Sequence, residues 1–281
     1  MKAASLTITA ITLCWAALAA AQEPAPALTP VDVRAVYVPG GIASQPDDPA
    51  WAELPESQLG LMEQIVLPPV GGGGVSQIAV RAMHDGEWLA IRLEWDDSSM
   101  DREVGVDTFR DAAAVGFPIG QPDPLPSPFM GDAEHAVAIW QWTADFDANA
   151  RGQGGFAERY PHTEGVWYFP QDAALRREVQ AWRGTEPVVE YRAVGFGTLA
   201  RRPGGNVVGA SARAKDRWAV VLRRRLQTGD PEDPDFKPGE STNLVAAVWD
   251  GSHDEVNGRK SVTLLWNPFR LDPTVAVDVA P

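Results

Sequence analysis

Residues 75–95 read Val75-Ser-Gln-Ile-Ala-Val-Arg-Ala-Met-His-Asp-Gly-Glu-Trp-Leu-Ala-Ile-Arg-Leu-Glu-Trp95, with an apolar run on either side of His84-Asp85-Gly86. Apolar runs of this length, bounded by turn residues, are typical of β-strands. An Asp-Gly pair between two such runs is typical of a hairpin turn. We therefore expect strands over residues 75–83 and 87–95, joined as an antiparallel hairpin.

Short apolar runs of the same kind occur along most of the chain, and few stretches have a helical pattern. They cover residues 31–38, 62–67, 107–117, 135–142, 188–199, 207–213, 217–226, 244–249 and 260–266. Many short strands without regular β-α-β alternation predict a mainly all-β protein. We expect an antiparallel β-sandwich with long loops and a few short helices. The long loops 96–134, 145–187 and 227–242 predict a covered site or partner surface, because long loops on a β scaffold usually carry function.

The N-terminus has the pattern of a secretory signal peptide. Lys2 is followed by the apolar segment 6–18 and by Ala19-Ala20-Ala21, which fits the small-residue cleavage rule. We expect export and removal of residues 1–21. Residues 22–30 then form a Pro/Ala linker, and residues 31–281 form a single domain. No later stretch approaches the 18 apolar residues of a membrane-spanning helix.

Composition excludes several classes of site and partner. The only cysteine is Cys14, so the mature chain would have no disulfide, iron–sulfur ligand, zinc thiolate or covalently attached c-type haem. The net charge is −14, and removal of the signal, whose only charged side chain is Lys2, makes it −15. This charge argues against nucleic acid and anionic membranes as partners, and it favours a basic protein partner.

The stretch Pro126-Ser-Pro-Phe-Met-Gly-Asp132 leads into the expected strand over residues 135–142. It places Met130 at the mouth of a strand, near the aromatic residues Phe129, Trp140 and Trp142. A thioether in aromatic surroundings can be a core filler or a soft metal ligand. Most methionines only pack, and the residues around Met130 leave both interpretations open.

A second informative stretch joins the last two expected strands. It reads Ala247-Val-Trp-Asp-Gly-Ser-His-Asp-Glu-Val-Asn-Gly-Arg-Lys-Ser-Val262, so that Lys260 opens the final strand. Lys260 is one of only three lysines after the signal. A lysine in this position is typical of an edge strand protected against aggregation.

Together the two stretches resemble a known family. The resemblance is carried by Pro128-Phe129-Met130-Gly131-Asp132, by Ala138-Ile139-Trp140-Gln141-Trp142, and by Val248-Trp249-Asp250-Gly251 followed by Gly258-Arg259-Lys260-Ser261-Val262. These motifs are similar to those of the haem b (gamma) subunits of periplasmic type II molybdenum enzymes of the dimethyl sulfoxide reductase group. That group includes ethylbenzene dehydrogenase, dimethyl sulfide dehydrogenase, chlorate reductase and selenate reductase. The resemblance spans residues 31–271.

The resemblance implies a periplasmic cytochrome subunit that transfers electrons and catalyses no substrate chemistry itself. It implies one non-covalent haem b with Met130 and Lys260 as axial iron ligands, and His135 is the best substitute ligand. Aromatic wall candidates and a nearby arginine complete the expected haem pocket: Phe129, Trp140, Trp142, Trp249 and Arg259. The expected partners are a molybdopterin catalytic subunit and an iron–sulfur subunit, forming a heterotrimer, and a soluble cytochrome c or similar redox protein.

The alternative function is a secreted carbohydrate-binding β-sandwich module, because the chain has 11 tryptophans and exposed indoles often stack on sugars. Other motifs are weaker. The acidic loops 230–235 and 250–255 lack the EF-hand pattern, which favours solvated loops over calcium sites. The Gly71–Gly74 run lacks the Lys-Ser/Thr of a phosphate-binding loop.

Overall fold

The computed structural model describes residues 29–66, 68–153, 186–202 and 205–274. The expected signal segment 1–21 and nearly all of the linker 22–30 lie outside these residues. The helices within the described ranges are the 3-10 helices η1 (Pro49–Glu53) and η2 (Gly251–His253) and the α-helix α1 (Ala144–Ala150). None of the described helices has the length and hydrophobicity that a bilayer crossing needs.

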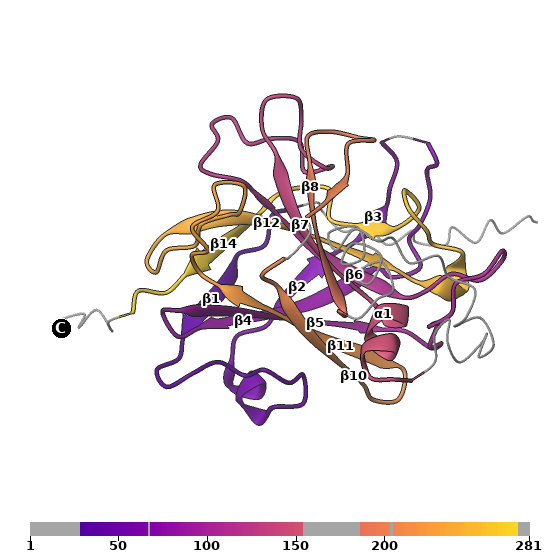
Figure 1. Cartoon of the computed structure of the whole chain (residues 1–281), viewed down its shortest axis with the longest axis horizontal. Helices are drawn as coiled ribbons and strands as arrows, with labels where there is room; N and C mark the ends of the chain where they lie inside the picture. Colours follow the sequence, from indigo (N-terminus) through magenta and orange to yellow (C-terminus); the bar gives the residue numbers. More distant parts are fainter. Residues whose placement is uncertain (1–28, 67, 154–185, 203–204, 275–281) are drawn as a thin grey trace, which may run out of the picture.

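The fold is the expected mainly-β sandwich (Figure 1). In the first layer the strand order is β10-β11-β5-β4-β1-β14, and β2 pairs with β4. The bounds are β1 Val33–Tyr37, β2 Ser57–Gly60, β4 Gln77–His84, β5 Trp88–Asp96, β10 Val208–Arg213, β11 Arg217–Arg225 and β14 Asn267–Leu271. In the second layer the order is β12-β6-β7-β8-β9, with β13 between β12 and β3. The bounds are β3 Met62–Glu63, β6 Ala112–Pro118, β7 Val137–Thr143, β8 Val188–Ala193, β9 Ala200–Arg201, β12 Ser241–Trp249 and β13 Ser261–Val262.

The two layers are joined because β12 takes part in both. Its residues Ser241–Leu244 pair with β14 in the first layer, whereas Val245–Trp249 pair with β6 in the second. A strand that crosses between sheets makes a corner, a known way of closing a sandwich. The second half of β12 therefore lies inside the second sheet, with β6 on one side and β13 on the other.

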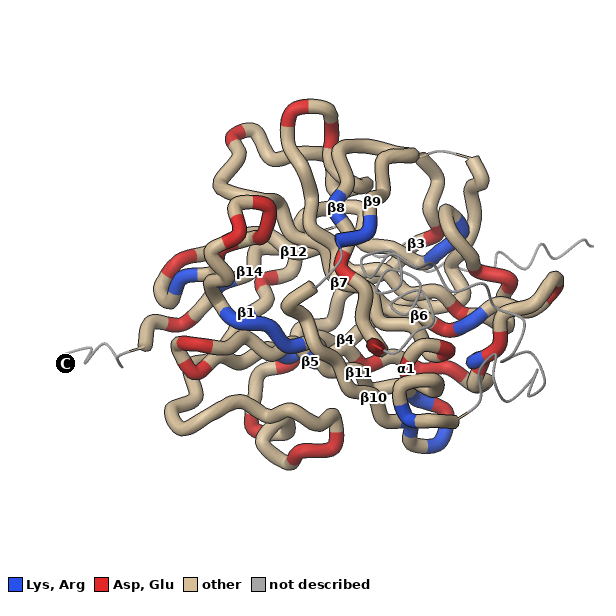
Figure 2. Tube along the Cα trace, viewed as in Figure 1, with Lys and Arg blue, Asp and Glu red and all other residues tan. Residues whose placement is uncertain are grey.

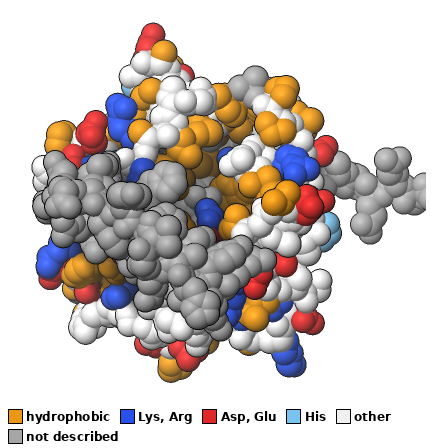
Figure 3. Space-filling model, turned by 45° about the vertical axis from the view of Figure 1, so that its right-hand side comes forward, with side chains coloured by type: hydrophobic (Ala, Val, Ile, Leu, Met, Phe, Trp, Pro, Cys, Tyr) orange, Lys and Arg blue, Asp and Glu red, His pale blue; other side chains and the backbone are white. Residues whose placement is uncertain are grey.

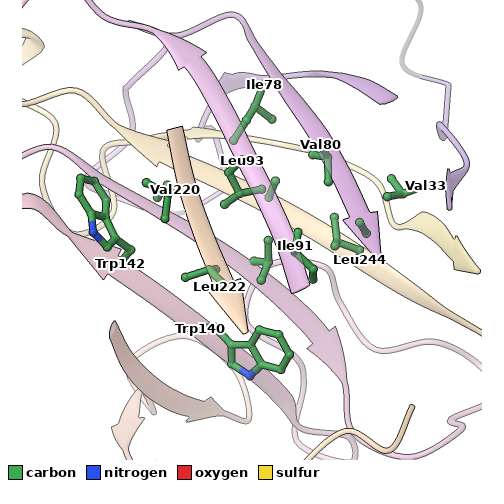
Figure 4. Close-up of a cluster of buried hydrophobic side chains, with 14 of the residues drawn as sticks. Val33, Ile78, Val80, Ile91, Leu93, Trp140, Trp142, Val220, Leu222 and Leu244 are labelled. Atoms are coloured by element: carbon green, nitrogen blue, oxygen red, sulfur yellow. The ribbon is translucent and has the colours of Figure 1, made fainter. Parts of the chain in front are cut away.

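The main core fills the space between the layers. Trp95 of β5 and Trp218 of β11 meet Trp142 of β7 with ring centroids 6.1 and 5.0 Å apart. Figure 4 shows Trp140 and Trp142 in one cluster with apolar residues of β11 and β5. A fully buried indole removes a large apolar area from water, so these contacts contribute strongly to stability.

The hairpin expected over residues 75–95 is confirmed as β4 and β5, which pair antiparallel. Its turn is held by Asp85 Oδ1, which accepts hydrogen bonds from the N–H groups of Glu87 and Trp88. The exception to the antiparallel expectation is β1, which runs parallel to both β4 and β14. No tight turn joins β1 to either neighbour, so nothing local imposes the antiparallel direction.

Candidate functional site

A cavity of about 630 Å³ lies on the outer face of the second sheet, opposite the sandwich core. Along β6 the residues largely alternate: Ala112, Ala114 and Gly116 line the cavity, whereas Ala113, Val115 and Phe117 pack in the main core, and Val115 also borders the cavity. Successive side chains of a strand point to opposite faces, so both faces of β6 are used. The small residues leave space directly above the sheet, as a flat ligand would require.

The neighbouring strands extend this floor, and loops form the walls. β7 contributes Ile139 and Gln141, and β12 contributes Ala247 and Trp249. A separate small hydrophobic cluster forms on this outer face of the sheet. Figure 3 shows hydrophobic side chains gathered around a hollow on this side of the molecule, with a basic side chain inside it.

Trp140 and Trp142 do not line the cavity, which corrects their expected role as pocket walls. Both are fully buried between the sheets, where the Trp140 ring lies 5.0 Å from that of Phe117. The alternation along residues 137–142 separates the two faces of β7 correctly. It does not say which face meets the cavity, because both faces are covered.

Met130 lines the cavity from the loop between β6 and β7, next to Phe129. Its backbone is in the left-handed region, with φ 72°, and that of Gly131 follows with φ 76°. The carbonyl of Met130 accepts a hydrogen bond from the N–H of Gly195 at 2.8 Å, which ties this loop to the chain beyond β8. A non-glycine residue held in this region costs about 1–3 kcal/mol and is often found at functional sites.

Gly131 is required by close backbone packing. A Cβ on this residue would lie 2.8 Å from the carbonyl oxygen of His135 and 3.0 Å from that of Ala193. The N–H of Gly131 also donates to the carbonyl of Ser127 at 3.0 Å. The Met-Gly pair in the sequence is therefore one structural unit that fixes where the Met130 backbone sits.

Lys260 lines the cavity from the opposite region of the sequence, immediately before β13. Its N–H donates to the carbonyl of Gly71 at 3.0 Å, and its carbonyl accepts from the N–H of Gln64 at 3.1 Å. A Cβ on Gly72 would lie 2.1 Å from the Lys260 carbonyl oxygen. The glycine run therefore permits a close backbone approach that clamps Lys260.

The amine of Lys260 is in an apolar setting. Its Nζ lies 5.1 Å from the centroid of the Trp249 ring, and no carboxylate of the described residues is within ion-pair distance. Burial lowers the pKa of Lys260 to about 8. The residue keeps some accessible surface because it lines the cavity, while protein surrounds the rest of it.

Arg259 and His135 lie outside the cavity lining. The side chain of Arg259 packs beside Gly71, whose added Cβ would be 3.6 Å from Arg259 Cγ and Cδ. The Nδ1 atom of His135 is 3.8 Å from Asp132 Oδ1. These two residues are near the candidate ligands in sequence. Of the site residues expected from the sequence, those that line the cavity are Met130, Lys260, Phe129 and Trp249.

Several residues line the cavity without having been expected from the sequence: Gln64, Phe109, Arg110, Tyr191 and Phe196. Arg110 lies two residues before the start of β6, and its Nη1 donates to Asp145 Oδ2 at 2.6 Å. Tyr191 reaches the site because β8 pairs with β7. No local pattern could have identified these residues, since their positions depend on pairing between distant strands.

The family profile described as ethylbenzene dehydrogenase matches residues 48–261. The chain belongs to this family. The matched span of the ethylbenzene dehydrogenase family contains both Met130 and Lys260, together with the strands β6, β7 and β12 that form the cavity floor.

Three curated proteins resemble this member of the ethylbenzene dehydrogenase family over most of their length. Chlorate reductase subunit gamma of Ideonella dechloratans is 29% identical, covering 92% of this chain and 92% of that protein. Dimethylsulfide dehydrogenase subunit gamma of Rhodovulum sulfidophilum is 27% identical over 87% and 83%. A putative respiratory nitrate reductase heme subunit of Haloferax mediterranei is 25% identical over 95% and 83%.

Among solved structures, the chain is similar to a family 9 carbohydrate binding module from Caldicellulosiruptor kristjanssonii in complex with cellotriose. The TM-score is 0.41 at 10% identity, covering 89% of this chain and 98% of that one.

Proposed function

We propose that this chain is the haem-carrying, electron-transferring gamma subunit of a molybdenum oxidoreductase, with Met130 and Lys260 as the axial ligands of the iron. The observation that carries the proposal is that these residues, far apart in sequence, line one cavity. Two relatives are named gamma subunits and a third is named a heme subunit, which supports the same function.

The residues present fit a non-covalent haem. The cavity offers a thioether and an amine as donors, and its volume is in the range of cofactor sites. Its floor of small residues on β6 leaves room for a planar ring. The chain has no cysteine outside the expected signal, so a b-type haem is favoured over a c-type haem.

A bound haem, its iron held by Met130 and Lys260, would supply reversible one-electron transfer. The role of Met130 is to present a soft sulfur that carries no proton and favours the reduced metal. The role of Lys260 is to present a neutral amine, which its apolar surroundings favour because desolvation disfavours the ammonium form. Phe129, Ile139 and Trp249 line the same cavity and would restrict water around these donors.

After export the chain would lie in the periplasm, with a molybdopterin subunit and an iron–sulfur subunit as partners. A soluble cytochrome c or a similar protein would exchange electrons with it. The substrate would be converted on the molybdopterin subunit. Co-purification of the tagged chain with both subunits tests this assembly, and recovery of the chain alone from gently lysed cells would count against it.

The haem assignment is tested by the absorption spectrum and iron content of the purified full chain. We expect a red protein with one iron per chain and sharp α and β bands on reduction. A colourless protein retained on polysaccharide gels would support the sugar-binding alternative instead. Among the tryptophans of the described residues, Trp88 and Trp266 are half-buried and the others are buried.

A further inference from the structure

Three buried aspartates meet beside the cavity floor, and the proposed haem site does not use them. Asp97 follows β5, Asp111 precedes β6 and Asp250 follows β12. Each offers a carboxylate oxygen, and these oxygens all lie within 4.8 Å of one another. The residues are 4%, 0% and 4% exposed, so little water can screen the repulsion between their charges.

One carboxylate oxygen of this cluster has no partner. Asp97 Oδ2 is buried and accepts no hydrogen bond from the described residues. The other oxygen, Oδ1, accepts from the N–H of Ser99 at 2.9 Å. A buried carboxylate oxygen without a donor is costly, and in native proteins it calls for a proton or a cation.

The other two carboxylates are held in place by donors of the protein. Asp111 Oδ1 accepts from the N–H of Gly251 at 3.0 Å, and its Oδ2 accepts from Trp218 Nε1 at 3.1 Å and from the N–H of Asp101 at 2.8 Å. Asp250 Oδ1 accepts from the N–H of Ser252 at 2.9 Å. Each carboxylate oxygen has more than one lone pair, so this arrangement orients the group and leaves capacity for a ligand.

Basic side chains neutralise this cluster incompletely. His253 Nδ1 lies 2.7 Å from Asp250 Oδ2, on the exposed side of the cluster. Arg213 Nη2 donates to the backbone carbonyl of Asp97 at 2.6 Å rather than to its carboxylate. Within the described ranges, no lysine or arginine forms an ion pair with any of the three aspartates.

Burial and mutual repulsion favour a bound proton when no cation is present. Burial, followed by the nearby charge of Asp97, raises the pKa of Asp111 to about 7, and burial also raises the pKa of Asp97. A divalent cation would compete with that proton and release it on binding.

We infer that Asp97, Asp111 and Asp250 bind one hard divalent cation, of which calcium fits best. The ligand atoms are all carboxylate oxygens, which calcium and magnesium prefer over softer metals. Hydrogen bonds already hold the carboxylates in place, and calcium accepts irregular geometry, whereas magnesium demands a near-ideal octahedron. Waters or backbone carbonyls complete its shell.

The cation would stabilise the floor of the cavity by holding together one end of the paired strands β6 and β12. Asp111 precedes β6 and Asp250 follows β12, and these two strands pair with each other. Glu255 lines the cavity and its Oε2 accepts from the N–H of Asp250 at 3.0 Å. The cation therefore joins the strand ends beside Trp249, and its binding does not depend on the haem assignment.

The test uses the purified full chain, stripped with a chelator and titrated with calcium chloride. We expect one calcium ion per chain by isothermal titration calorimetry, with proton release near neutral pH. With free calcium about a hundredfold above Kd, we expect Tm to rise by about 5–10 °C. Magnesium at the same concentration should give a much smaller rise, and an equal rise would overturn the assignment to calcium.

Asp97→Asn keeps the side-chain shape and the acceptor that faces Ser99. This variant should lose the calcium-dependent rise in Tm. In chelator its Tm should be at least that of the wild type, because one repelling charge is gone. The matched control is Asp254→Asn in the same acidic loop: Asp254 is exposed, outside the trio, and its φ of 57° suits asparagine.

The control should keep the full calcium response. A calcium response that persists in Asp97→Asn would overturn the site and indicate diffuse binding to an acidic protein. Absence of any heat or Tm change in the wild type would overturn it as well. Iron content and the haem spectrum are measured on the same samples, so loss of haem and loss of calcium are distinguished.

Discussion

Met130 and Lys260 are the candidate iron ligands that the family resemblance implies, and their backbones are restrained in ways that the sequence shows only indirectly. Met130 sits in the left-handed region, and Lys260 is clamped by the loop around Gly71. At each position a glycine permits the approach that fixes the candidate ligand. The Met-Gly pair and the glycine run are visible in the sequence, but only the structure shows which residue each one holds.

Met130→Ala should remove the thioether from the cavity. We expect a five-coordinate or water-ligated haem with a lower redox potential, because the soft ligand that favours reduced iron is lost. Redox titration and the ferric absorption spectrum measure both effects. Met100→Ala is the matched control, since Met100 is exposed and lies outside the cavity lining. A low-spin spectrum and an unchanged potential in Met130→Ala would show that Met130 only packs.

Lys260→Arg should preserve the positive charge and lose the ligand, because a guanidinium stays protonated while an amine with a pKa lowered to about 8 can release its proton. We expect a folded protein, by circular dichroism, whose haem is high-spin or absent. Lys237→Arg is the control: its side chain is 53% exposed and its Nζ lies 3.8 Å from Glu240 Oε2. A normal low-spin spectrum in Lys260→Arg would assign the ligand elsewhere.

At the scale of elements, local sequence patterns predict where the strands lie better than they predict which strands pair with one another. The hairpin β4–β5 could be predicted because both strands and their turn are contiguous. The parallel pairing of β1 and the shared use of β12 by two sheets could not, because both depend on contacts between distant segments. The same limitation explains Trp140 and Trp142, since the face of β7 that meets the cavity is decided by what packs on each side.

The glycine run before β4 gives a prediction at this scale. Gly72→Ala would place a Cβ 2.1 Å from the carbonyl oxygen of Lys260, so the clamp on Lys260 must shift. We expect haem affinity to fall at least about tenfold, measured by haem transfer to apomyoglobin. Gly41→Ala is the control, because Gly41 has φ +118° against +119° for Gly72 but has nothing within 4 Å of an added Cβ.

Gly41→Ala should carry the same backbone strain, of about 1–3 kcal/mol, and retain haem normally. If both variants lost haem equally, general destabilisation would explain the effect and the clamp would have no specific role. If neither lost haem, the position of the Lys260 backbone would not limit binding. Urea unfolding of both variants separates stability from affinity.

At the scale of the whole molecule, charge is the property that composition predicts directly. The chain has 38 acidic and 24 basic side chains, and Figure 2 shows acidic residues on loops around much of the outline. An excess of negative charge creates an electrostatic field that attracts basic proteins. The field extends over about a Debye length, which is close to 10 Å at 0.1 M salt. Composition does not identify the docking face, since that depends on how the loops fold together.

Electron exchange with a basic cytochrome c should therefore slow as salt rises. Steering of opposite charges raises association rates by orders of magnitude at low ionic strength, and counter-ions screen it. We expect the second-order rate constant from stopped-flow absorbance to fall at least about tenfold between about 10 mM and 500 mM sodium chloride. A neutral small-molecule oxidant is the control, because its rate should stay nearly constant. A flat salt profile with cytochrome c would mean that apolar contact, rather than the net charge of −14, governs the encounter.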